Sequence, residues 1–389
     1  MITQSMPIVP PEVRADLIGS RVRSAERVVL SVVIPALNEE KFIGHCLNSL
    51  AGQTLGRDKF EVIVVDNGST DRTREITAKF ETFLNLRVLE AGKGNISALR
   101  NQGASFATGS FLAFLDADCF PTSTWLSDAM QLLRLGDGGV IGAFYTIPDK
   151  SRWVAKAWYG DMSTMRSGGV SYVPSGNLFV SRNLFLRLGG FAPAIQTSED
   201  FEFCQRVKTA GYGVQAIPKL SVVHAGTPQT CGQFYRKQRW HGNGVRTAFV
   251  RDIFDRAFAR TVALTACIVL SLVISVLGVP VAIVISRYAV MFIGPGFLLA
   301  GAIALATRAA IIRRRWSLVP TLTILYLTYG LARALSLIGL DGKRSARPTT
   351  SQEECEHGNV ECLAPTAKTV IHSPQEAAIN YPPGSRAGF

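Results

Sequence analysis

The sequence has no Cys-x-x-Cys pair and no cysteines and histidines at zinc-binding spacing, although it contains seven cysteines. Cysteines scattered in this way indicate a reducing compartment rather than a disulfide framework. A basic heptad region and the aromatic strand motif of RNA-binding domains are also missing, so nothing predicts a nucleic-acid-binding module. The first 20 residues lack a continuous apolar core and therefore do not predict a signal peptide.

The net charge is +12, and basic residues gather close to the apolar part of the chain. The clusters YRKQRW at 235–240 and RRRW at 313–316 are the clearest examples. A strongly basic chain suits nucleic acid, an anionic membrane surface or a phosphate-bearing substrate. The placement of the basic clusters beside the apolar runs favours a membrane surface as the partner, and we expect no nucleic-acid partner.

Charged residues become rare after about residue 260, where three apolar runs cover 261–285, 288–306 and 317–340. About 20 apolar residues suffice to cross a bilayer, so the first two runs predict membrane helices. The third run contains Arg333, which must snorkel, face protein, or mark a helix lying in the interface. Arginine clusters beside membrane helices favour the cytosolic side.

Residues 28–225 alternate short apolar runs with helix-like stretches, which predicts an α/β domain. Continuous apolar strands separated by helices indicate a mainly parallel sheet covered on both faces. The expected strands lie at 27–37, 60–66, 86–90 and 110–118, and the expected helices at 38–53, 73–84 and 96–107.

Polar residues follow three of these strands, at Ala36–Glu39, Asp66–Ser69 and Asp116–Asp118. Ligands of such sheets bind beyond the carboxyl ends of the strands, so these residues should converge on a ligand. The carboxylates of Asp116 and Asp118 could ligate Mg²⁺ or Mn²⁺, which prefer oxygen ligands. An Asp-x-Asp pair also occurs in solvated turns, but its position after a buried strand favours the cation.

Other polar residues near these strand ends could contact a nucleotide. Asp66 could accept hydrogen bonds from a base or ribose, and Glu39 could cap a helix or contact a ribose hydroxyl. The glycine-rich stretch 91–103 lacks the Walker spacing GxxxxGK[ST]. Three of its residues could still approach a diphosphate: Lys93, Arg100 and Asn101.

The stretch SEDFEFCQRVKTAG at 198–211 predicts a helix that Ser198 caps. Its first-turn acids favour the helix dipole. Glu199 or Asp200 could also be a general base, since a carboxylate can take a proton from an attacking hydroxyl. His224 could contact a metal or be an ordinary buried histidine. The stretch RKQRWHGNG at 236–244 could hold a diphosphate or lie at the membrane surface.

The motifs VIPALNEE, VVDNGSTD, GKGNISALRN, FLDAD and SEDFEFCQR, in this order, resemble the inverting glycosyltransferases of family 2. The resemblance covers about residues 28–245. It implies a GT-A fold, Rossmann-like with helices on both faces of a mainly parallel sheet. Bacterial members that build polysaccharides or lipid-linked sugars also carry C-terminal transmembrane helices, as expected here.

The resemblance also implies roles for the matching residues. Asp116 and Asp118 match the family's DxD motif, which holds a Mg²⁺ or Mn²⁺ ion against the diphosphate. The pair Glu199 and Asp200 matches the catalytic acidic motif, in which the aspartate is the base. A direct displacement with one inversion would follow. The implied contacts to the nucleotide-sugar, expected to be UDP-linked, are Pro35, Ala36, Glu39, Asp66, Lys93, Arg100, Asn101, Asp116, Arg239 and Trp240.

Processive synthases of the family carry Gln-x-x-Arg-Trp, but here Arg236 stands at the glutamine position before Arg239 and Trp240. We therefore expect transfer of one sugar at a time to a lipid-linked or polysaccharide-precursor acceptor. The alternatives are a processive synthase, a nucleotidyltransferase of similar layout and a non-catalytic nucleotide-sugar-binding membrane protein. The glycine-rich basic loop that follows the first strand of nucleotidyltransferases is missing here. The intact acidic motifs argue against a protein that binds a nucleotide-sugar without catalysing transfer.

The expected organisation is a polar leader at 1–27 and a GT-A domain at 28–245. An interfacial helix with two to three membrane helices at 246–340 and a disordered tail at 341–389 would follow. The catalytic domain is expected on the cytosolic side of the cell's inner, cytoplasmic membrane, with membrane lipids as partners.

Overall fold

The computed structural model describes residues 28–92, 94–136, 138–162, 166–250, 256–284 and 288–337. The predicted leader, the predicted tail and Lys93 lie outside these ranges.

An eight-stranded sheet forms the centre of the α/β domain, with the strand order β3-β2-β1-β4-β8-β6-β9-β7. Neighbours among β1, β2, β3 and β4 pair in parallel, whereas β8 runs antiparallel to β4 and β6. The mixed, mostly parallel sheet confirms the predicted α/β class. The strands are β1 (Leu30–Ala36), β2 (Phe60–Asp66), β3 (Leu86–Glu90), β4 (Phe111–Leu115), β6 (Val140–Gly142), β7 (Gly168–Gly169), β8 (Asn177–Ser181) and β9 (Val214–Ala216).

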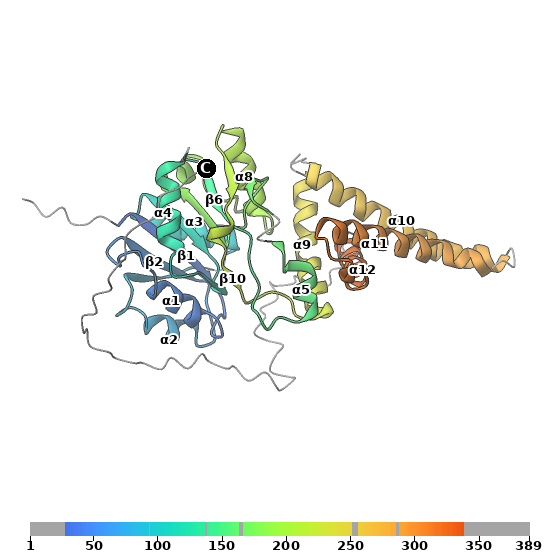
Figure 1. The fold of residues 1–389 in the computed structure, drawn as a ribbon, viewed down its shortest axis with the longest axis horizontal. Coiled ribbons are helices and arrows are strands. Elements are labelled where there is room, and N and C mark those ends of the chain that lie inside the picture. The colour runs from blue at the N-terminus through green and yellow to red at the C-terminus, as the bar shows by residue number, and fades with distance from the viewer. Residues whose placement is uncertain are drawn as a thin grey trace, which may run out of the picture. The chain divides into compact units, whose positions relative to one another are not determined.

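Helices cover both faces of this sheet (Figure 1). The side chains of Val32 and Ile34 face one layer and that of Val33 faces the other, so every residue of β1 is buried. This is why the strand is apolar throughout instead of alternating. One layer contains α1 (Ile43–Ala51), α2 (Thr73–Ala78) and α4 (Trp125–Leu135), and the other α3 (Ile96–Phe106), α7 (Arg182–Arg187) and α8 (Glu199–Thr209).

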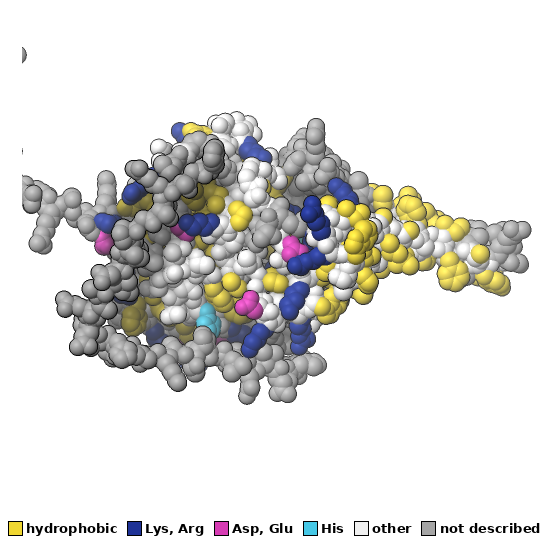
Figure 2. Space-filling model, in the orientation of Figure 1, with side chains coloured by type: hydrophobic (Ala, Val, Ile, Leu, Met, Phe, Trp, Pro, Cys, Tyr) yellow, Lys and Arg dark blue, Asp and Glu magenta, His cyan; other side chains and the backbone are white. Residues whose placement is uncertain are grey.

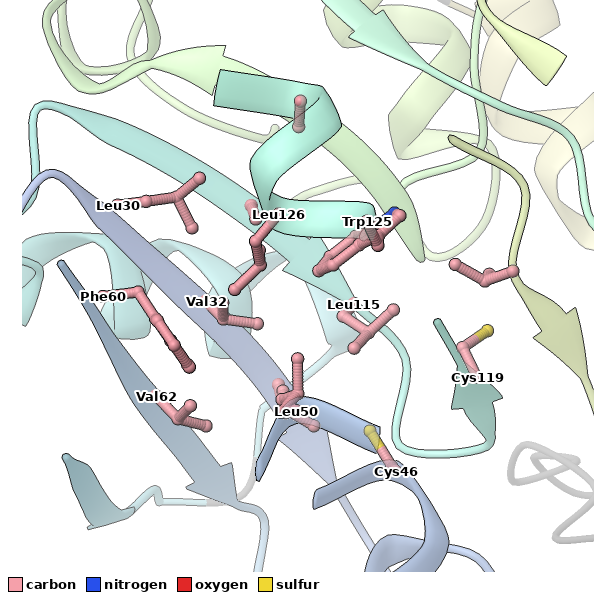
Figure 3. Close-up of a cluster of buried hydrophobic side chains, with 14 of the residues drawn as sticks. Leu30, Val32, Cys46, Leu50, Phe60, Val62, Leu115, Cys119, Trp125 and Leu126 are labelled. Carbon is pink, nitrogen blue, oxygen red and sulfur yellow. The ribbon is translucent and has the colours of Figure 1, made fainter. Parts of the chain in front are cut away.

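Figure 3 shows the first of these layers, where Leu30, Val32, Phe60 and Val62 pack with side chains of α1 and α4. Trp125 is fully buried there, and its Nε1 donates a hydrogen bond of 3.1 Å to Oδ1 of Asn177. Asn177 begins β8, so this bond ties the start of the antiparallel strand to the core.

The second short sheet pairs β5 (Cys119–Phe120) with β10 (Val223–His224) in antiparallel fashion. In its register His224 lies opposite Cys119. The pairing brings the residue after the DxD motif next to a histidine that is far away in the sequence.

Most of the described residues after His224 are helical. Two described segments are long and apolar enough to cross a membrane, Ile293–Ile312 and Trp316–Ser336, corresponding to the second and third predicted runs. The first run lies in α10, whose described apolar part is Ala266–Pro280. The helices are α5 (Trp153–Tyr159), α9 (Cys231–Val250), α10 (Arg256–Val284), η3 (Tyr288–Phe292), α11 (Ile293–Ile312), η4 (Trp316–Leu318) and α12 (Val319–Leu337).

Some predicted helix boundaries were wrong. The helix expected at 38–53 begins only at Ile43, because Asn38 takes a left-handed φ of 54° and its side chain accepts a hydrogen bond from the Thr70 N–H. The helix expected at 73–84 ends at Ala78. Ser198 precedes α8 with a left-handed φ of 70°, and its side chain makes no capping hydrogen bond.

Candidate functional site

The candidate site lies where β1, β2 and β4 end. Ala36 pairs with Asp66 in the register of β1 and β2, so these two strand ends are side by side. Asp116 follows β4, and its N–H donates a hydrogen bond of 3.3 Å to the Gly176 carbonyl just before β8. Three predicted strand ends therefore meet at one edge together with the start of an antiparallel strand.

Arg100 of α3 is the buried centre of this edge, with 1% of its surface exposed. Its Nη2 donates to Oδ1 of Asp116 at 2.6 Å, and its Nη1 donates to Oε1 of Glu199 at 2.7 Å. The Ser175 hydroxyl donates to the same glutamate oxygen at 2.9 Å. Buried charges are costly unless they are paired and hydrogen-bonded, so this arrangement fixes both acidic motifs relative to each other.

Asp200 follows Glu199 in the first turn of α8 and is partly buried. Its Oδ1 accepts a hydrogen bond of 2.8 Å from the Phe201 N–H. Burial and the negative charge of Glu199 raise the pKa of Asp200 to about 7. A carboxyl group that titrates near neutral pH is suited to proton transfer.

Asp118 lies beside His224, with 3.7 Å between Oδ2 and Nε2. Ligand atoms of Asp118, Cys119 and His224 all lie within 4.8 Å of one another, and all three residues are buried. Burial and the nearby charges of Asp118 and Asp116 raise the pKa of the Cys119 thiol well above its usual value. Hard cations such as Mg²⁺ and Mn²⁺ prefer oxygen ligands to a thiolate, so Cys119 suits them less well than its two neighbours do. The carboxylate and the imidazole fit a divalent cation such as Mn²⁺.

Two glycines leave room for the two DxD carboxylates. A Cβ on Gly176 would lie 2.4 Å from Oδ2 of Asp116 and 2.5 Å from the Tyr145 hydroxyl. A Cβ on Gly226 would lie 2.1 Å from Oδ2 of Asp118. Any side chain at either glycine would therefore displace a carboxylate.

The residues expected at the nucleoside are engaged with protein groups. Asp66 is buried and accepts hydrogen bonds from the N–H groups of Gly68 and Ser69 and from Nε of Arg74 at 2.6 Å. The Glu39 N–H donates to the Thr73 hydroxyl at 2.7 Å. Pro35 and Ala36 end β1 with buried side chains. The bonds of Asp66 fix the turn that follows β2.

The side chain of Asn101 hydrogen-bonds the backbone of Phe191, in the segment that precedes α8. Its Nδ2 donates to the Phe191 carbonyl at 2.7 Å, and its Oδ1 accepts from the Phe191 N–H at 2.9 Å. Arg239 and Trp240 lie on α9, where the Arg239 carbonyl accepts a hydrogen bond from Ser336 of α12 and the Trp240 ring contacts His241.

The remaining site residues have only weak sequence signals. The sequence leaves open whether His224 is a metal contact or an ordinary buried histidine, and only the pairing of β5 with β10 brings it to Asp118. Tyr145, whose ring centre lies 4.6 Å from that of His224, follows a short strand and has no motif around it. The Pro-Ser-Gly-Asn turn at 174–177 is recognisable in the sequence as a turn before a strand that could line an acceptor pocket, and the structure adds that its glycine packs against Asp116.

Comparison with known sequences identifies the family. The profile described as Glycosyl transferase family 2 matches residues 31–188, and that of Glycosyl transferase family group 2 matches residues 113–332, more than half of the chain. The chain is 31% identical over 229 residues to the glycosyltransferase AglE of Haloferax volcanii, which covers 57% of this chain and 75% of AglE. The chain therefore belongs to glycosyl transferase family 2.

A second relative is the poly(ribitol-phosphate) beta-N-acetylglucosaminyltransferase TarS of Staphylococcus aureus. It is 43% identical over 105 residues, which cover 26% of this chain and 18% of TarS. Among solved structures, the mannosyltransferase PcManGT of Pyrobaculum calidifontis, in complex with GDP-Man and Mn²⁺, is 20% identical with a TM-score of 0.52. It covers 79% of this chain and 87% of its own, a likeness that supports the GT-A fold.

Proposed function

We propose that this chain is an inverting glycosyltransferase that moves a sugar from a nucleoside-diphosphate sugar, UDP-linked by expectation, to a hydroxyl acceptor. The acceptor would be a lipid-linked or polysaccharide-precursor glycan that receives one sugar at a time. Family membership supports the transferase activity. The named relatives include an N-acetylglucosaminyltransferase, and the related mannosyltransferase structure contains a nucleotide-sugar.

The observation that carries this proposal is the placement of Asp200 at the start of α8, directly after Glu199, which Arg100 links to Asp116. Burial and the charge of Glu199 raise the pKa of Asp200 to about 7, which suits a base. Asp200 would take the proton of the acceptor hydroxyl as that oxygen attacks the anomeric carbon. Glu199 accepts hydrogen bonds from Arg100 and Ser175, so we assign it to positioning rather than to attack on the sugar. One base without a carboxylate nucleophile supports a single displacement with inversion.

Asp118 and His224 would hold a divalent cation, and Asp116 lies two residues before Asp118 in the same motif. Such a cation offsets the charge that develops on the departing nucleoside diphosphate. The Asp116 carboxylate is already paired with Arg100, which would orient it rather than leave it to swing toward solvent.

The other predicted contacts form the donor side of the proposal. Pro35, Ala36 and Asp66 lie at the ends of β1 and β2, and Glu39 follows β1 three residues later. These four residues would border the nucleoside. Asn101 would contribute indirectly, by fixing the backbone at Phe191. The predicted roles of Lys93, Arg239 and Trp240 remain part of this proposal.

Membrane attachment is also part of the proposal. The apolar helices would hold a GT-A domain at 28–245 on the cytosolic side of the cytoplasmic membrane. The exposed apolar side chains of α10 and α11, which Figure 2 shows in yellow, support this attachment.

A panel of nucleotide-sugars tests the function. Membranes that contain the protein should release nucleoside diphosphate from one donor, with the sugar recovered in lipid-extractable or glycan material. Asp200→Asn should abolish transfer and keep donor binding. Glu202→Gln is the matched control that should keep transfer, because Glu202 lies two residues after Asp200 on the same helix and pairs with Arg206. Near-normal turnover by Asp200→Asn would refute the assignment of the base.

A further inference from the structure

The three apolar helices differ in what surrounds them. On α10 and α11 large apolar side chains are exposed on several sides, among them Val276, Leu277, Phe297 and Ile303. The buried residues of α11 are small: Gly294, Ala302, Ala306 and Ala310. A stripe of small residues against neighbouring helices, with large apolar groups outside, is typical of helices in lipid.

On α12 most of the described large apolar side chains are buried or half-buried. Leu322 and Leu325 are fully buried in a cluster with Phe234 of α9 and Val154 of α5. Among the described residues of α12, only Ile324 and Leu331 are large apolar side chains with strong exposure, 49% and 44%. They are seven residues apart and so share one face of the helix.

The covering element is α9, and the two helices contact each other through polar groups. Nη2 of Arg333 donates to Oε1 of Gln238 at 3.3 Å, and the Ser336 hydroxyl donates to the Arg239 carbonyl at 3.0 Å. A Cβ on Gly242 would lie 2.5 Å from Ser336, so the helix backbones approach closely there. Arg333 therefore faces protein, one of the three outcomes that the sequence left open.

The helix α5 of the catalytic region contacts α12 and the end of α11 at the same time. The Trp158 ring packs against Phe234, Tyr326 and Tyr329, with ring centres 4.9–5.7 Å apart. Arg313, just after α11, donates hydrogen bonds to the carbonyls of Ala157 and Trp158. The short helix α5 thus contacts Arg313, which precedes α12, and also Tyr329, in the second half of α12.

These contacts are incompatible with α12 crossing a bilayer. In a helix along the membrane normal, Tyr329 would lie about 20 Å deeper than Trp316, and Ser336 about 30 Å deeper. The neighbouring part of α9 would then be at the same depth, with Arg236, Lys237, Arg239 and His241 in the hydrocarbon. Cationic side chains are strongly disfavoured there.

We propose that, of these helices, only the α10–α11 pair inserts into the bilayer, and that α12 lies along the membrane surface between α9 and the lipid headgroups. The inference rests on the proposed membrane attachment. Trp316, 65% exposed, would lie with Ile324 and Leu331 at the level of the headgroups, beside the exposed Arg315. A pair of antiparallel spans returns the chain to the side from which it entered, so Leu337 lies on the side of the catalytic region.

Spin labels that report membrane depth test this arrangement. The reactive native cysteines are first replaced by serine. In this background, single cysteines are introduced at Trp316, just before α12, and at Ile324 and Leu331 on α12. Two further variants carry the single cysteine at Phe297 or Ile311 on α11. The full-length protein is reconstituted in phosphatidylcholine–phosphatidylglycerol vesicles, and only labelled variants that keep the wild-type unfolding temperature are compared. The three α12 labels should agree in depth within about 5 Å, whereas the α11 labels should differ by about 21 Å.

A steady increase in depth of about 22 Å from residue 316 to 331 would overturn the inference and leave membrane attachment intact. Two water-exposed α11 labels would overturn the attachment and the inference together. A reporter fused to the C-terminus of the full-length chain is an independent measurement. It should lie on the side of the catalytic region, and a position on the opposite side would contradict the surface placement of α12.

Discussion

The guanidinium group of Arg100 lies 2.7 Å from the carboxylate of Glu199, and both side chains are almost completely buried. The two residues are 99 positions apart in the sequence, one in α3 and the other at the start of α8. The same guanidinium also bonds Asp116. The position of the DxD motif and that of the candidate base are therefore set by one buried cation.

Replacing Arg100 should damage both folding and turnover. Arg100→Ala leaves two buried carboxylates without their cation, and breaking such a pair costs about 3–5 kcal/mol. Arg100→Lys should recover only part of the lost stability and turnover, because an ammonium group cannot reproduce the fixed geometry in which the guanidinium donates to both carboxylates. Thermal unfolding and transfer assays measure the two effects. Arg72→Ala, which removes a surface ion pair with Glu75, should change neither.

The rate of transfer should depend on pH through Asp200. As a base, this carboxyl is active only when deprotonated, so kcat/KM should rise with pH and level off above about 7. A pH–rate profile measured at saturating cation reports this pKa. An ascending limb centred near 4, the ordinary value for aspartate, would contradict the proposed environment of Asp200.

The same group predicts how stability changes with pH. The pKa of Asp200 is higher in the folded chain than in the unfolded chain, so its contribution is present at low pH and is lost as the pH rises from about 4 through 7. Asp200→Asn does not titrate. The variant should therefore gain stability relative to the wild type between pH 4 and pH 8, measured as the difference in unfolding temperature. A constant difference over this range would show that Asp200 titrates normally.

Gly226 should be essential for the proposed cation site. In Gly226→Ala the added Cβ meets Oδ2 of Asp118 and must displace it from His224. Mn²⁺ affinity, measured by electron paramagnetic resonance titration, should fall by about 10–100-fold, as for other losses of support to a metal ligand. Gly169→Ala, where no atom lies within 4 Å of the new Cβ, is the control that should bind Mn²⁺ normally.

The contact between α9 and α12 can be tested with two glycines of the same helix. Gly242→Ala forces a methyl group against Ser336 and should lower the free energy of unfolding by about 1–3 kcal/mol. Gly232→Ala meets nothing closer than 3.8 Å and should raise it by up to about 1 kcal/mol, because alanine favours helix. Both follow from thermal unfolding in detergent. Equal effects of the two changes would mean that α9 and α12 are apart in solution.

The sequence predicted the part of the fold that local patterns determine. The apolar runs of β1, β2 and β4 are recognisable because strands buried on both faces cannot alternate, and the polar residues at their ends follow from the parallel arrangement. The antiparallel direction of β8 had no such signal. It depends on the pairing of Leu115 with Asn177, which no local pattern encodes.

The candidate site was predictable as a set of residues but not as an arrangement. The motifs name Asp116, Asp118 and Asp200, yet their partners lie far away in the sequence. Arg100 was expected to face the donor, and its burial between two carboxylates could be seen only once α3, β4 and α8 were packed together. The left-handed backbone of Ser198 likewise results from tertiary packing rather than from its own preference.

The central strand β4 has a parallel neighbour on one side, β1, and an antiparallel neighbour on the other, β8. At one edge of the sheet, strands of the first half of the domain therefore end beside the point where a strand of the second half begins. Insertions or deletions between β6 and β8 can reshape one wall of the site without shifting the register of the other. The fold thus allows recognition of one substrate to diverge in evolution while the wall formed by β1, β2 and β4 is retained.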